Sequence, residues 1–143
     1  MIASSIDLAC EGRDSLDKDK LVAGSIGPYG ACLADGSEYT GAYKDTVSVQ
    51  QLSEWHKKRF EIIVDWTNCD ILAVETIPCI SEVEAILSLL KTRPGSKAWI
   101  SLSCNSGTTL NSGEKISDCV KKIEEIDTGT QVEAVGVNCS KFE

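Results

Sequence analysis

Four polar or cysteine-containing segments follow apolar runs in this sequence, where a buried strand would open into a site. They are SIGPYG at 25–30, ETIPC at 75–79, SLSC at 101–104 and NC at 138–139. Carboxylate, hydroxyl and thiol groups at such positions can bind a charged substrate or a metal ion. These four segments are therefore the first candidates for a functional site.

Glu75 is the sharpest single candidate. It follows the apolar residues 71–74 without polar alternation, so its carboxylate emerges where a buried strand ends. A carboxylate in such a place is costly unless a cation or hydrogen bonds compensate for the lost water. Two interpretations follow: Glu75 pins a loop, or it binds the ammonium group of a substrate. The strand-end position favours the second interpretation.

Cys139 could be a metal ligand, a nucleophile or a packing residue. Zinc sites need at least three protein ligands, and no second ligand lies near Cys139 in the sequence. Because Cys79 and Cys104 are expected at the same rim, a three-cysteine site within this chain is an alternative. The seven cysteines are odd in number and contain no CxxC pair, so most are expected to be small buried hydrophobic residues rather than disulfide partners.

Other motifs carry weaker signals. The glycines of SIGPYG lack the full pattern of a phosphate-binding loop and are better explained by a tight turn. His56 is the only histidine and has no identifiable partner, so packing or solvent contact is its expected role. Trp55 and Trp66 fall on one apolar helical stripe and are expected in the core.

Composition limits the class of protein. The chain has 143 residues, enough for one domain, and a net charge of −8 from 14 basic and 22 acidic residues. This charge argues against nucleic acid or an anionic membrane as the main partner. No apolar run approaches the roughly 20 residues of a membrane span. A cytoplasmic protein is the expectation.

The elements that would position these residues alternate between apolar strands and amphipathic helices. Helices are predicted over 2–16, 48–66, 81–92 and 112–127, and strands over 21–26, 71–75, 98–104 and 132–139. Ser48 with Gln51, and Ser81 with Glu84, have the spacing of helix capping boxes. Residues 30–46 show neither period and are expected to form a long loop.

This alternation is typical of a parallel sheet covered by helices, the α/β class. Ligands bind such sheets at the carboxyl ends of the strands, where the four segments above lie. Four strands cannot close a barrel of eight. The chain is therefore either a small open sheet or part of a barrel.

Four segments taken together resemble homocysteine S-methyltransferases. They are VAGSIGPYGACLADGSEYTGAY, ILAVETIPC, WISLSC and GVNC, in the order found in that family and spread over nearly the whole chain. The resemblance implies a partial (β/α)8 barrel, with strands 3 to 6 and their helices present. Residues 1–143 would then be a partial homocysteine-binding domain that lacks the N-terminal and C-terminal parts of the barrel.

The resemblance also implies an activity and its site. The family transfers a methyl group from S-methylmethionine or S-adenosylmethionine to homocysteine, giving methionine. Glu75 would bind the substrate amino group, Ser103 belongs to a strand-end motif placed with the substrate-binding residues, and Cys139 would be a zinc ligand. The coordinated homocysteine thiol loses its proton and becomes nucleophilic. No residue of this chain is assigned as a catalytic acid or base.

The sequence also departs from the family pattern. The two other zinc cysteines belong to a GGCC motif, and this chain has no adjacent cysteine pair. The prediction is therefore an inactive fragment of a methyltransferase with one of three zinc ligands. The alternative is a non-catalytic α/β remnant that associates with another chain. Exposed sheet edges favour self-association in either case.

Overall fold

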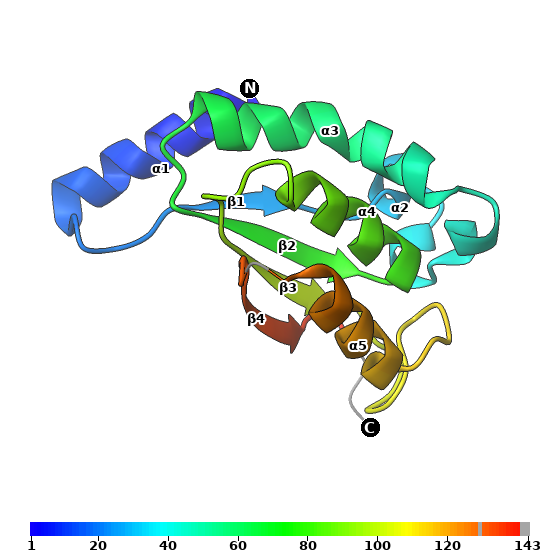
Figure 1. The fold of residues 1–143 in the computed structure, drawn as a ribbon. Coiled ribbons are helices and arrows are strands. Elements are labelled where there is room, and N and C mark those ends of the chain that lie inside the picture. Colours follow the sequence, from blue (N-terminus) through cyan, green and yellow to red (C-terminus); the bar gives the residue numbers. More distant parts are fainter. Residues whose placement is uncertain (129, 141–143) are drawn as a thin grey trace.

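The computed structural model describes residues 1–128 and 130–140 and contains one sheet with flanking helices (Figure 1). The elements run in the order α1 (Ile2–Leu16), β1 (Ala23–Ile26), α2 (Gly30–Leu33), η1 (Ser37–Tyr39), η2 (Ala42–Asp45), α3 (Val49–Trp66), β2 (Ile71–Ile77), α4 (Ile80–Leu90), β3 (Ala98–Leu102), α5 (Ile116–Ile126) and β4 (Val132–Val137). No helix in the described part of the chain is long and apolar enough to cross a membrane.

The four strands are parallel and lie in sequence order, β1-β2-β3-β4. Each crossover passes through a helix, and the helices follow one another across the same face of the sheet (Figure 1). All carboxyl ends of the strands therefore meet at one edge. The predicted α/β class, with four parallel strands and their helices, is confirmed.

The hydrophobic core lies between the sheet and its helices. Strand β3 shows the pattern clearly, because Ala98, Ile100 and Leu102 are buried while Trp99 and Ser101 are half-exposed. The buried set joins residues of α3, α4 and α5 such as Phe60 and Ile86 in one cluster. One face of the sheet is thus packed, and the other presents its side chains away from the helices.

One of the two predicted capping boxes is confirmed. At the start of α3, Ser48 accepts a hydrogen bond from the Gln51 backbone N–H, and the Gln51 side chain accepts one from Ser48. The second prediction, Ser81 with Glu84, is wrong. Helix α4 begins at Ile80 after Cys79, without a side-chain cap. The sequence spacing alone does not show that the helix begins one residue earlier, at Ile80. Nor does it show that Glu82, rather than Glu84, is the acid buried against the core.

The segment predicted as a structureless loop is partly helical. Residues 30–46 contain α2, η1 and η2, three short turns separated by Gly36 and Gly41 at positive φ. Gly30 packs against the Ser37–Glu38 backbone so closely that a Cβ atom there would overlap it. Turns this short carry no sequence period, so periodicity could not reveal them. They gather near the carboxyl ends of the strands (Figure 1).

The prediction that both tryptophans lie in the core is wrong for Trp66. Its side chain is 73% exposed at the end of α3, while Trp55 is half-buried against the Tyr29 ring with Arg59 over it. Trp66 is the last residue of the helix, where the apolar stripe leaves the sheet. The stripe therefore predicted the buried face of α3 correctly only as far as Ile63.

Candidate active site at the carboxyl ends of the strands

Glu75 is held at the sheet edge by the neighbouring strand. The Ser25 hydroxyl on β1 donates a hydrogen bond of 2.6 Å to Glu75 Oε1 on β2. Glu75 is half-buried, and within the described residues no lysine, arginine or histidine forms an ion pair with it. A fixed carboxylate without a cation is suited to binding the ammonium group of a ligand.

Strand β2 continues past the predicted end at Glu75. It runs to Ile77, and its pairing with β3 shifts register between Val74 and Ile77. Thr76 within this irregularity has φ +64°, a rare conformation for a β-branched residue. The bulge re-aims the side chains on either side of Thr76, which is a common use of bulges beside functional sites.

Ser103 is placed at the predicted edge but is fully buried. Its hydroxyl accepts a hydrogen bond from the Asn111 side chain, and its backbone N–H and C=O bond Ile77 and Asn111. The side chain thus fixes the loop after β3. A direct contact between Ser103 and substrate stays a prediction, and the geometry favours an indirect one through Asn111.

Cys139 lies two residues after the end of β4 and is exposed, with φ +49°. It lines a cavity of about 260 Å³ together with Tyr39, Cys104, Asn105 and Asn111. Burial raises the pKa of the Cys104 thiol, so at neutral pH Cys104 is a protonated packing residue. Cys139 is therefore the thiol of this edge that is open to a ligand.

Among the described residues, Cys79, Cys104 and Cys139 do not form a three-cysteine metal site. Cys79 is fully buried beside Ser81, and burial raises the pKa of its thiol to about 11. In residues 1–128 and 130–140, no three histidine, cysteine, aspartate or glutamate side chains are placed to hold one metal ion. The donors described here do not amount to a zinc site, and the three-cysteine alternative is wrong.

The remaining cysteines behave largely as predicted. All seven are free thiols, and Cys10, Cys79, Cys104 and Cys119 are buried. Burial raises the pKa of Cys119 to about 12. Cys69 is half-buried, and Cys32 is exposed like Cys139.

His56 has a partner that the sequence did not reveal. It is fully buried, and its Nε2 lies 2.7 Å from Glu82 Oε1. The same carboxylate accepts hydrogen bonds from the Tyr29 backbone N–H and the Tyr43 hydroxyl. Glu82 on α4 thereby anchors α3 and the segment with the short turns, which in turn supplies Tyr39 to the cavity.

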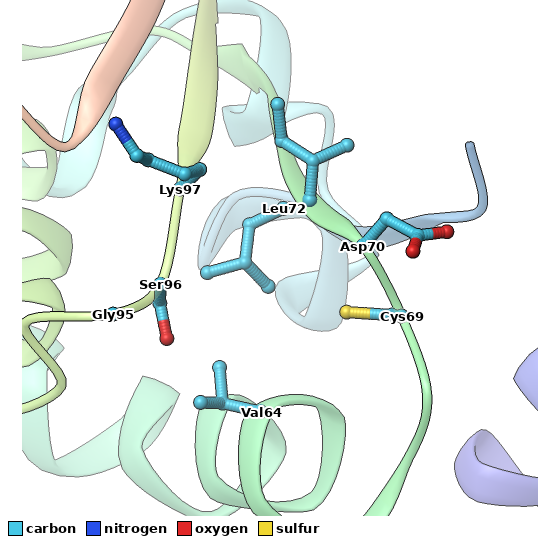
Figure 2. Close-up of a pocket in the computed structure, with 8 residues that line it drawn as sticks. Val64, Cys69, Asp70, Leu72, Gly95, Ser96 and Lys97 are labelled. Atoms are coloured by element: carbon cyan, nitrogen blue, oxygen red, sulfur yellow. The ribbon is translucent and has the colours of Figure 1, made fainter.

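A second cavity lies at the opposite end of the sheet and is a poor candidate for the site. Its volume is about 210 Å³, and residues before the starts of β2 and β3 line it, among them Cys69, Asp70 and Lys97 (Figure 2). The Asp70 carboxylate points away from the cavity and binds the Val22 N–H and Arg13. In parallel α/β folds this end serves stability rather than chemistry.

Comparison with known proteins confirms the resemblance that the four sequence segments indicated. A family model described as homocysteine S-methyltransferase matches residues 1–143. The chain is 40% identical to homocysteine S-methyltransferase YbgG of Bacillus subtilis (strain 168), over 100% of the chain and 46% of the relative. It is 42% identical to a betaine-homocysteine S-methyltransferase of Drosophila melanogaster, over 83% of the chain and 37% of the relative.

Solved structures give the same result. The metallated form of the homocysteine methyltransferase MmuM from Escherichia coli superposes with a TM-score of 0.87 at 40% identity, covering 96% of this chain and 48% of that one. The oxidized form gives the same TM-score. The chain spans about half the length of these relatives. The predicted fold, part of a (β/α)8 barrel, is confirmed.

Proposed function

The chain belongs to the homocysteine S-methyltransferase family, and we propose that its strand-end site takes part in methyl transfer to homocysteine. S-methylmethionine or S-adenosylmethionine is the proposed donor. The homocysteine thiol releases its proton to solvent, and the resulting thiolate attacks the donor methyl carbon. The donor sulfur–methyl bond breaks, and its electron pair stays on the donor sulfur. Methionine and a neutral thioether result. Cytoplasmic location stays a prediction from composition.

The observation that carries the proposal is the placement of Glu75. Its carboxylate is oriented by Ser25, forms no ion pair with a described side chain, and lies at the edge that also holds Cys139. Glu75 would bind the homocysteine ammonium and so orient the sulfur. Cys139 would supply one thiolate to the family's zinc, with the other ligands outside the residues described here.

A chimera tests this function. We expect that an Escherichia coli homocysteine S-methyltransferase whose matching segment is replaced by this chain forms methionine from homocysteine and S-methylmethionine. Glu75→Gln in the chimera should raise KM for homocysteine about tenfold with less change in kcat, because a charge-assisted hydrogen bond of roughly 1.5 kcal/mol is lost.

Controls separate folding from function in this assay. Glu84→Gln on α4 removes an equal charge and should leave KM unchanged, because the Glu84 carboxylate faces Lys122 of α5 and does not line the strand-end cavity. A soluble chimera that binds zinc stoichiometrically but makes no methionine would contradict the proposal. An unchanged KM in Glu75→Gln would contradict the role of Glu75 alone.

A second candidate function, association without catalysis, rests on the edge of the sheet at β4. Val135 and Val137 are 42% and 47% exposed, and among the described strands β4 pairs with β3 alone. Open edges with exposed apolar side chains favour pairing with another chain. We propose that the isolated chain self-associates through β4.

Light scattering of the purified chain tests this association. We expect species larger than 15.4 kDa, shifted toward the monomer by Val135→Lys with Val137→Lys, because edge lysines oppose strand pairing. Asp118→Asn on α5 with Glu54→Gln on α3 changes the net charge equally at exposed positions away from β4, and should leave the association unchanged. A monomeric parent chain would disprove the proposal.

A further inference from the structure

We propose that Asn138 is a positioning residue that ties the ends of β2 and β4 together across β3 and so fixes Glu75 relative to Cys139. Asn138 precedes the proposed zinc ligand, and the sequence placed it in a candidate segment without assigning it a role. The inference rests on the proposed roles of Glu75 and Cys139. It concerns how their relative position is maintained.

The Asn138 side chain makes two hydrogen bonds to one residue of β2. Its Oδ1 accepts from the Thr76 backbone N–H at 2.9 Å, and its Nδ2 donates to Thr76 Oγ1 at 2.9 Å. Its own backbone N–H donates to the Leu102 carbonyl at the end of β3, at 3.0 Å. Strands β2 and β4 are not neighbours in the sheet, so this side chain joins two strands that share no ladder.

Thr76 is the residue at this edge that most needs such support. It has φ +64° where the β2–β3 register shifts. A non-glycine residue keeps this strained conformation only when its surroundings enforce it. The Asn138 side chain supports it in two ways. It accepts a hydrogen bond from the Thr76 backbone N–H, and it donates one to the Thr76 hydroxyl. Alanine at 138 could do neither.

The two residues adjoin the two proposed functional groups. Glu75 precedes Thr76 in the bulge, and Cys139 follows Asn138. Cys139 Sγ lies 3.9 Å from Thr76 Oγ1 and 3.7 Å from Asn138 Nδ2. The hydrogen-bonded pair of Asn138 and Thr76 therefore fixes the position of the Glu75 carboxylate, which would bind the ammonium, and that of the Cys139 thiol. Ser25 fixes the carboxylate from the other side.

Thiol–disulfide exchange at Cys139 in the intact chain measures this relation. Cystamine carries an ammonium two carbons from its sulfur, whereas 2-hydroxyethyl disulfide carries a neutral hydroxyl. The ratio of their rates at one thiol cancels the nucleophilicity of that thiol and reports the nearby carboxylate. Mass spectrometry resolves Cys139 from Cys32, the other exposed cysteine, which serves as an internal reference.

We expect the cystamine preference at Cys139 to exceed that at Cys32. Glu75→Gln should lower it about threefold, the size of an exposed ion pair. Asn138→Ala should lower it about twofold to threefold, and should have no further effect in the Glu75→Gln background, because it acts through Glu75. Asn68→Ala, exposed at the opposite end of the sheet, should leave the ratio unchanged.

Thr76→Val keeps the backbone hydrogen bond but removes the hydroxyl, and provides a milder test if Asn138→Ala fails to fold. It should lower the Cys139 ratio in the same direction by less. Unchanged ratios in Asn138→Ala and Thr76→Val, with a lowered ratio in Glu75→Gln, would overturn the positioning role alone. No effect of Glu75→Gln would overturn both this inference and the ammonium-binding role of Glu75.

Discussion

Glu82→Ala is expected to lower the free energy of unfolding by about 3 to 5 kcal/mol, the typical cost of breaking a buried charged network. The Glu82 side chain is fully buried, accepts hydrogen bonds from the Tyr29 N–H and the Tyr43 hydroxyl, and is hydrogen-bonded to His56 Nε2. Its removal leaves the Tyr29 N–H, the buried Tyr43 hydroxyl and the buried His56 ring without their partner, and each buried polar group left unpaired costs on the order of 1 to 3 kcal/mol. Chemical denaturation followed by circular dichroism measures the loss.

Glu84→Ala is the matched control for this substitution. Glu84 lies two residues along the same helix, is half-buried, and has Lys122 at 3.9 Å as its nearest cation. A surface charge of this kind contributes at most about 1 kcal/mol. Equal destabilisation by the two substitutions would show that Glu82 does not anchor the segment between β1 and α3.

The hydrogen bonds of Glu82 show which part of the fold could not be predicted from the sequence. Periodicity predicted the long helices and the four strands, because their apolar residues repeat along the chain. The anchor of residues 30–46 is a contact between Tyr43 and Glu82, 39 positions apart. Glu82 lies between the capping candidates Ser81 and Glu84, and nothing in the sequence marked it as a buried acid. Only the tertiary structure shows which of these residues points into the core.

Some residues of the candidate site could be placed from the sequence, and others could not. The positions of Glu75 and Cys139 at one edge of the sheet could be predicted, because polar or cysteine residues after an apolar run mark the end of a buried strand. Ser25 lay in a candidate segment, but its hydrogen bond to Glu75, 50 positions away, could not be predicted from the sequence. Asn111 lies in the loop after β3 and Tyr39 in the short turn η1, and Asn138 acts on Thr76 at a separation of 62 residues. Side-chain pairings across a sheet leave no local signal in one sequence.

Cys139→Ser in the chimeric enzyme is expected to lower methionine formation by more than the 10- to 100-fold typical of losing an outer partner of a metal ligand. A serine hydroxyl stays protonated at neutral pH and is a poor zinc ligand, whereas a cysteine thiolate is a good one. Zinc measured by elemental analysis should fall below one equivalent, in parallel with activity. The loss should persist at saturating homocysteine, which separates it from the KM effect expected for Glu75→Gln.

Substitutions of two further cysteines test whether the loss of zinc and activity is specific to Cys139. Cys32→Ser replaces the other exposed thiol and should retain zinc and activity. Cys104→Ser replaces a buried thiol of the same cavity, whose pKa is raised by burial, and should also retain zinc. Full zinc content in Cys139→Ser with loss of zinc in Cys104→Ser would transfer the ligand role to Cys104. Full zinc content in both variants would remove the metal from this edge of the sheet altogether, and would leave Glu75 as the main functional group that this chain contributes.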